Sequence, residues 1–165
     1  MAFLLDANVF IQAKNLHYGF DFCPAFWTWL DEKLDSGVVA SVSQVGDELI
    51  DGTDDLAEWA KERRESLFPS PDASVLGALT KVSGWAMGGG FDQAAVNTFL
   101  QIADSFLVAA ALANGHTLVT HELPSNSLKR IKIPTACISL GLPFCSPYQM
   151  LRREKARFIL GRTGQ

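Results

Sequence analysis

The chain of 165 residues is long enough for one domain with a sizeable core, and its 48% hydrophobic content excludes a disordered protein. A net charge of -4 argues against binding nucleic acid through bulk positive charge, although a bound metal ion could still screen phosphates locally. No apolar run reaches the roughly 18 residues of a membrane helix. Three scattered cysteines match neither a disulfide framework nor a zinc site, so we expect a cytoplasmic protein without a membrane segment.

The first part of the chain alternates between short strands and helices. Short apolar runs that end in a polar residue or glycine indicate strands, and apolar residues at helical spacing indicate helices. In chain order we expect a strand over 3–5, a helix over 8–14, a helix from Pro24 to a stop at Gly37, a strand over 38–40, and two helices capped by Ser43 and Thr53.

The alternation continues after a break at residues 69–71. Three successive glycines at 88–90 predict a turn or mobile loop, because glycine does not hold a regular element. In chain order we expect a helix over 75–84, a helix capped by Asp92, a helix over 104–114 stopped by Gly115, strands over 116–120 and 136–138, and a closing helix from Pro147. This order predicts one α/β domain over 1–160 with a mostly parallel sheet, followed by a disordered tail over 161–165.

Four carboxylates are predicted to meet at one edge of this sheet. Asp6 ends the first strand, and Glu122 follows the strand that ends at Thr120, so both lie where parallel sheets bind ligands. Asp104 begins an almost entirely apolar helix, and Glu48 lies on the helix after the second strand. Crowded carboxylates repel one another unless a cation neutralises them, and ligand sets made only of oxygen suit Mg²⁺ or Mn²⁺.

Each of these acids also has an ordinary structural explanation. Asp6 and Asp104 stand where helix caps are expected, and Asp is a favoured capping residue. Glu48 beside Asp47 could belong to a solvated helix face, and Glu122 could be a solvated loop residue. The functional interpretation therefore depends on all four acids lying at the same edge.

The motifs around the acids resemble those of the PIN-domain family of metal-dependent ribonucleases. The resemblance lies in residues 4–10, 41–49, 103–111 and 117–122, in that order and spacing. Residues 132–158 also resemble one subgroup of bacterial PIN-like proteins, which are relatives of VapC-type toxins. The last motif departs from the family pattern, because Thr120-His121-Glu122 carries Glu where the family usually has Asp.

The resemblance implies a three-layer α/β/α fold and hydrolysis of RNA phosphodiesters by water bound to Mg²⁺ or Mn²⁺. Asp6, Glu48 and Asp104 would then be metal ligands, and Glu122 would hold a second ion or a metal-bound water. Asp47 remains an alternative to Glu48. Because many bacterial members are toxins, the resemblance also implies an antitoxin partner and a possible homodimer.

Three polar residues beside the acids have open roles. Asn8 suits orienting a carboxylate or touching phosphate, and it could equally be a polar residue at a helix start. Thr120 could hydrogen-bond to Asp6 or to water, or could simply be a β-branched strand residue. His121 suggests a general base, although a histidine in a loop is more often solvated.

Basic residues gather in the last part of the chain. From Lys129 to the end there are eight Lys and Arg residues but only one acid. They could guide RNA phosphates toward the acids, form a solvated helix face, or contact an acidic antitoxin segment. The residues expected to guide RNA are Lys129, Arg130, Arg152 and Arg153, within a stripe that also contains Lys132, Lys155 and Arg157.

Two other functions remain compatible with the sequence. A phosphatase of the haloacid-dehalogenase type also begins with an Asp at a strand end. It normally requires a second Asp two residues later, where this chain has Asn8, and a supporting Lys that the sequence does not place. A PIN-like RNA- or protein-binding module without catalysis is the other alternative, which Glu122 and the acidic net charge favour.

Overall fold

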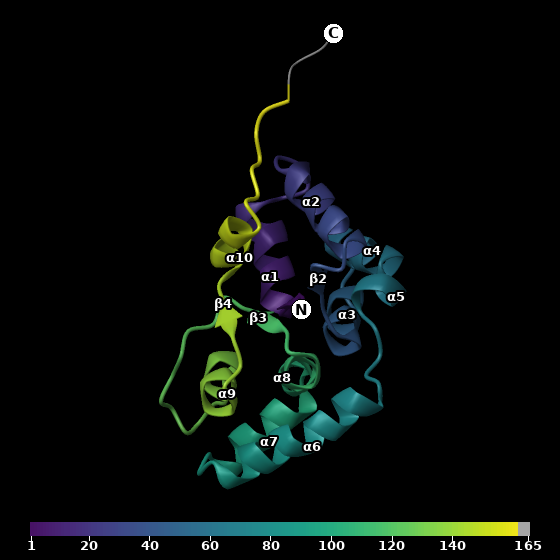
Figure 1. The fold of residues 1–165 in the computed structure, drawn as a ribbon. Helices are drawn as coiled ribbons and strands as arrows, with labels where there is room; N and C mark the ends of the chain where they lie inside the picture. The colour runs from purple at the N-terminus through teal and green to yellow at the C-terminus, as the bar shows by residue number, and fades with distance from the viewer. Residues whose placement is uncertain (162–165) are drawn as a thin grey trace.

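The computed structural model describes residues 1–161, and its strands form one parallel sheet (Figure 1). The strand order is β2-β1-β3-β4, and β1 pairs with β2 on one side and with β3 on the other. This arrangement confirms the predicted parallel α/β class, and it places all carboxyl ends of the strands at one edge. The strands are β1 (Phe3–Leu5), β2 (Val39–Ala40), β3 (Thr117–Val119) and β4 (Phe144–Cys145).

Helices cover both faces of the sheet and complete the three layers (Figure 1). In Figure 1, α8 and α9 lie on one side of the strands, with α6 and α7 beyond α8, whereas α1, α2 and α10 lie on the other side. The helices are α1 (Ala7–Gln12), α2 (Pro24–Asp35), α3 (Ser43–Ile50), α4 (Asp55–Glu62), α5 (Arg64–Leu67), α6 (Ala73–Gly88), α7 (Gln93–Gln101), α8 (Ala103–Asn114), α9 (Ile133–Leu140) and α10 (Pro147–Arg153), and the π-helix η1 (Ala13–His17) extends α1.

The central helix α8 positions one of the predicted acids. Its residues Leu107, Val108 and Ala109 are fully buried, as expected for a helix that is apolar on all sides. Gly115 ends α8 in the left-handed conformation (φ 66°), which sends the chain directly into β3. The start of α8, with Asp104, therefore lies at the edge where the strands end.

No single helix within residues 1–161 is long and apolar enough to span a membrane. Only α7 and α8 taken together pass by length and composition, and the chain bends by 71° between them. The apolar character of α8 is explained by its burial in the core.

The predicted strand over 136–138 is wrong, because these residues lie inside α9. A run of three apolar residues fits either element, and here Ile133, Ala136 and Cys137 share one buried face at helical spacing. Pro134 in the first turn and Gly141 in the left-handed conformation (φ 69°) mark the two ends of this helix. The fourth strand lies later in the chain, at β4.

Two predicted helix caps are also wrong. Val42 occupies the cap position of α3, so Ser43 is already inside the helix. The carboxylate of Asp54, and not Thr53, caps α4 by accepting the N–H of Ala57 at 3.0 Å. Of the predicted tail, residues 162–165 lie outside the described residues.

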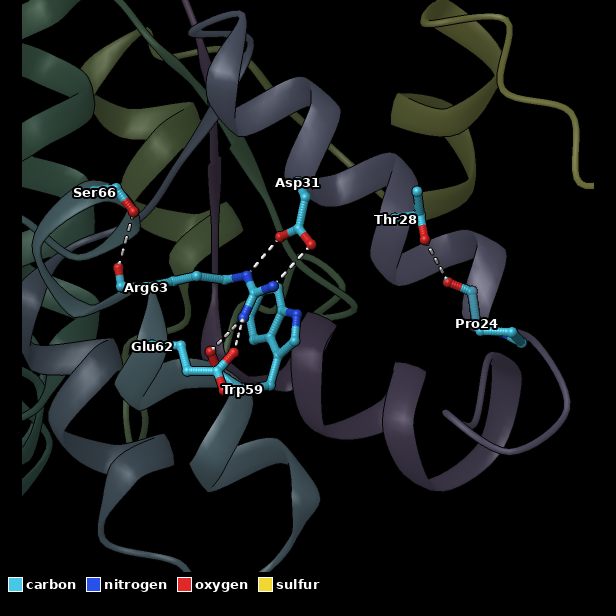
Figure 2. Close-up of polar contacts among 7 residues, drawn as sticks. All are labelled: Pro24, Thr28, Asp31, Trp59, Glu62, Arg63 and Ser66. Atoms are coloured by element: carbon cyan, nitrogen blue, oxygen red, sulfur yellow. Dashed lines mark hydrogen bonds and ion pairs between the residues drawn. The ribbon is translucent and has the colours of Figure 1, made fainter.

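Arg63, directly after α4, joins this helix to α2 (Figure 2). Its guanidinium donates through Nη2 to Oδ2 of Asp31 at 2.8 Å and through Nε to the other carboxylate oxygen. Nη1 donates to the carbonyl oxygen of Trp59 at 2.9 Å, and the guanidinium lies 4.5 Å from the centre of the Trp59 ring. This contact packs α4 and α2 together on the same side of the molecule.

Candidate metal centre

The four predicted acids come from separate segments that meet at the carboxyl edge of the sheet. Asp6 directly follows β1, Glu48 lies on α3, Asp104 lies in the first turn of α8, and Glu122 follows β3. Asp6 is only 5% exposed, Asp104 and Glu122 are partly buried, and Glu48 is exposed. The site therefore has a buried end at Asp6 and an open end at Glu48.

The pKa of Asp104 depends on the charges of the other three acids. Burial is the main cause that raises the pKa of Asp104 to about 7, and the charges of Asp6, Glu122 and Glu48 raise it further. Arg130 lowers it. Asp104 thus lies within electrostatic reach of the other three carboxylates, and their repulsion opposes its ionisation.

The pKa of Asp6, at the buried end of the site, is also raised. Burial is the main cause that raises its pKa to about 6. The hydrogen bond from Thr120 lowers this pKa, whereas the charges of Glu122 and Glu48 raise it. Burial also raises the pKa of Glu48.

Helix capping does not explain the position of Asp6 or of Asp104. Asp6 occupies the cap position of α1, but its side chain accepts no capping hydrogen bond from that helix. The cap position of α8 belongs to Ile102, and Asp104 lies two residues inside. Neither acid makes the usual side-chain capping bond, although the backbone N–H of Ala7, the first residue of α1, lowers the pKa of Asp6. Asp104 lies in the first turn of α8, where the helix dipole favours an acid.

The structure separates Asp47 from Glu48. Asp47 forms an ion pair with Arg64 on the surface, away from the other acids. Glu48 is the residue whose charge raises the pKa of Asp6 and of Asp104. The geometry therefore favours Glu48 as the fourth member of the cluster.

A hydrogen-bond network holds the buried end of the site. The Thr120 hydroxyl donates to Oδ2 of Asp6 at 2.8 Å, and it accepts from Nδ2 of Asn8 at 3.2 Å and from the backbone N–H of Glu122 at 3.1 Å. Oδ1 of Asn8 accepts the backbone N–H of His121 at 3.2 Å. Asn8 thus orients Thr120 and the loop after β3, and it makes no direct hydrogen bond with a carboxylate of the cluster.

Glu122 is held by its own contacts at the start of α9. Oε2 accepts the backbone N–H of Ile133 at 3.1 Å, and Oε1 lies 3.5 Å from Nη2 of Arg130. The positive end of the helix dipole and the guanidinium both stabilise its negative charge there. Glu122 is therefore the acid of this cluster whose side chain accepts the most hydrogen bonds, two against one for Asp6.

The donor set fits a hard divalent cation. The cluster offers carboxylate oxygens only, which suits Mg²⁺ or Mn²⁺ and not Zn²⁺. Within residues 1–161, the side chains of Glu48 and Asp104 have no hydrogen bond or ion pair, so their oxygens are available to a ligand. No three His, Cys, Asp or Glu side chains of this range are already grouped tightly enough to enclose an ion.

Two of the predicted RNA-guiding residues lie beside this cluster. Lys129 and Arg130 line a small cavity together with Asp104, over an apolar floor that contains Phe99 and Ile102. Arg152 and Arg153 lie at the exposed end of α10 and do not line that cavity. The predicted basic stripe is therefore divided between two places on the molecule.

Residues 3–158 match the family described as "Domain of unknown function (DUF4411)". The chain belongs to this family. No curated protein sequence matches it significantly. Among solved structures, the DUF4411 chain is similar to one described as VapBC2 from Rickettsia felis bound to a DNA fragment from their promoter, with a TM-score of 0.53 and 15% identity over 88% of this chain and 98% of the other. This likeness establishes a shared fold, and the predicted PIN-like α/β/α architecture is confirmed.

The DUF4411 chain also brings together residues that the sequence did not single out. The rings of His17 and Tyr148 lie beside His121, each with its ring centre within 6 Å of the other two. These residues come from η1, α10 and the loop after β3, and more than 100 positions separate His17 from the others. Apolar periodicity does not report on such partly exposed rings, so only the fold reveals the cluster.

Proposed function

We propose that this DUF4411 protein is an endoribonuclease that depends on Mg²⁺ or Mn²⁺. The observation that carries the proposal is the set of four carboxylates from separate segments at the ligand-binding edge of a parallel sheet, where burial and the charges of the other three raise the pKa of Asp104. Carboxylates that hold a divalent ion and leave it open to substrate are typical of phosphoryl chemistry. The PIN-like fold supports the same reaction.

Each residue of the cluster has a role in this proposal. Asp6, Glu48 and Asp104 would hold the ion, and Glu122 would hold a second ion or a water molecule. A bound ion would polarise the phosphate and lower the pKa of a water molecule. Thr120 occupies one oxygen of Asp6 and so leaves the other oxygen of that carboxylate for the ion.

We further propose that the protein is the toxin of a toxin–antitoxin pair. The similar Rickettsia felis structure is described as a VapBC2 complex, which supports a protein partner for this chain as well. A partner that covers the acid cluster would block cleavage. Co-expression with the product of the neighbouring gene, followed by pull-down and a cleavage assay, tests this part of the proposal.

The decisive experiment for the nuclease is cleavage of a single-stranded RNA pool by the purified protein. We expect cleavage with Mg²⁺ or Mn²⁺, none after chelation, and a loss on the order of 100-fold or more in Asp104→Asn, since metal ligands supply several kcal/mol to the transition state. Asp47→Asn is the matched control, because this neighbouring acid pairs with Arg64 outside the cluster, and it should keep its activity.

Three results would contradict the proposed nuclease: no cleavage of any RNA, cleavage that survives chelation, or equal activity in Asp104→Asn. Metal binding measured by calorimetry without cleavage would instead support the binding module that the sequence left open.

A further inference from the structure

Three aromatic rings from separate elements meet at the carboxyl edge of the sheet. His17 ends η1, His121 follows β3, and Tyr148 lies in the first turn of α10. The distances between ring centres are 5.6 Å for His17–His121, 5.7 Å for His121–Tyr148 and 5.5 Å for His17–Tyr148. The Tyr148 hydroxyl hydrogen-bonds to Nε2 of His17 at 2.9 Å. We refer to these three residues as the ring cluster.

The ring cluster is open to solvent, unlike the aromatic residues of the core. Tyr148 is 37% exposed, and both histidines are partly exposed, whereas Phe26 is 1% exposed. Core packing therefore does not account for three rings from three elements at one surface position. None of them has a role in holding the acids through a side-chain contact.

A continuous path of hydrogen bonds connects the ring cluster to the acid cluster. Thr120 donates to Asp6, Asn8 donates to Thr120, and the backbone of His121 donates to Asn8. His121 also directly precedes Glu122 in the chain. The loop that carries the His121 ring is thus bonded to the buried end of the acid cluster.

A cationic side chain borders the ring cluster. Arg152 lies one helical turn after Tyr148 on α10, so the two side chains share one helix face. Its charge also lowers the pKa of Tyr18, the neighbour of His17 in the chain. Stacking surfaces next to an Arg are the usual elements of single-strand binding.

We infer that the ring cluster is a subsite that stacks one unpaired base of an RNA strand, with Arg152 at a neighbouring phosphate, and so positions the strand across the acids. This inference rests on the proposed function. A protein with a net charge of -4 gains little from bulk attraction of phosphates, so stacking of a base would add binding energy to the local phosphate contacts. Every base has a π-face, so this subsite would accept RNA with little sequence preference.

The test uses single-stranded RNA that carries the fluorescent base 2-aminopurine, whose emission is quenched when it stacks. Binding is measured with Asp104→Asn protein, so that the strand stays intact, and cleavage is measured with the otherwise native protein. Tyr148→Ala and His17→Ala each remove one ring, and they lie on different elements, so a folding defect in one leaves the other informative. Tyr148→Phe keeps the ring and removes only the hydroxyl. Phe22→Ala is the matched control, because this ring is 65% exposed and lies outside the cluster.

We expect the two alanine variants to weaken RNA binding about 5- to 100-fold, as loss of one stacking partner does, and to lose the quenching. In the cleavage assay KM should rise by a similar factor while kcat changes little. Phe22→Ala should behave like the native protein, and Tyr148→Phe, which keeps the ring, should retain the quenching.

Unchanged binding, quenching and KM in both alanine variants would overturn the subsite while leaving the nuclease proposal intact. Loss of activity in Tyr148→Phe equal to that in Tyr148→Ala would also overturn it, because the hydroxyl and not the ring would then matter. If the native protein cuts no RNA and the alanine variants still lose the quenching, the nuclease proposal fails and the subsite stands.

Discussion

Thr120 is the residue on which the buried end of the acid cluster depends most directly. Its hydroxyl is 2% exposed and has three partners, which are Asp6, Asn8 and the backbone N–H of Glu122. One donated and two accepted hydrogen bonds use the full capacity of a hydroxyl group. The sequence left open either a hydrogen bond from Thr120 to Asp6 or a purely β-branched role, and the folded chain shows that hydrogen bond together with two others.

Thr120→Val should destabilise the protein by roughly 1–3 kcal/mol, because the similar shape remains while buried donors lose their acceptor. It should also raise the pKa of Asp6 further, because the hydrogen bond from Thr120 lowers that pKa. Urea unfolding and an NMR titration of Asp6 measure the two effects. Thr120→Ser keeps the hydroxyl and should stay close to the native protein. Equal stability of the Val and Ser variants would contradict this role.

Asp104 makes the stability of the protein depend on pH. Its pKa is about 7 in the folded state against an ordinary value of 3.8, so the folded state binds the proton more tightly. Metal-free stability should therefore fall as pH rises from about 4 to about 7 and then level off, since stability falls wherever the folded state binds more protons.

Asp104→Asn should consequently be more stable than the native protein at pH 8 by on the order of 2–4 kcal/mol, since one pKa unit corresponds to about 1.4 kcal/mol. Urea unfolding at pH 4 and pH 8 without metal measures the difference, which should nearly vanish at pH 4. A native protein that is as stable at pH 8 as at pH 4, and gains nothing from the substitution, would contradict the raised pKa of Asp104.

At the scale of elements, Arg63 is the polar contact that joins α4 to α2 (Figure 2). Arg63→Ala should destabilise the protein by about 1–2 kcal/mol, because a bidentate, stacked and partly buried guanidinium is lost. Arg63→Lys should recover only part of this, since Lys lacks the second donor. Arg64→Ala is the control, because its ion pair with Asp47 is exposed and should contribute less than about 0.5 kcal/mol. Equal effects of Arg63→Ala and Arg64→Ala in urea unfolding would contradict this assignment.

Two agreeing signals made some helices predictable from the sequence, whereas a short apolar run alone left strand and helix undecided in one place. The helix that ends at Gly115 combines an apolar run with a terminal glycine, and it forms as predicted. Residues 136–138 carry only a short apolar run, which suits either a strand or a buried helix face. The start signal at Pro134 and the stop at Gly141 indicate α9 once they are considered together.

At the scale of the whole molecule, a divalent ion at the acid cluster should stabilise the fold. An ion at 100 times its Kd adds about 2.7 kcal/mol, and this corresponds to a rise in Tm of roughly 5–10 °C for a chain of this size. The rise should be larger at pH 8 than at pH 5, because protons compete for Asp6 and Asp104, whose pKa values are about 6 and about 7. Thermal melts with Mg²⁺ and Mn²⁺ measure it, and Asp104→Asn should reduce it. No shift at millimolar metal would contradict a shared cation site.

The sequence by itself determined the parallel α/β class and the placement of four acids at strand and helix ends, because apolar periodicity and chain order are local properties. Only the tertiary structure decided which carboxylates repel one another, that Glu48 and not Asp47 joins them, and that His17 meets His121 and Tyr148. Those facts depend on side chains far apart in the chain, and the packing of helices against the sheet is what sets the distances between them.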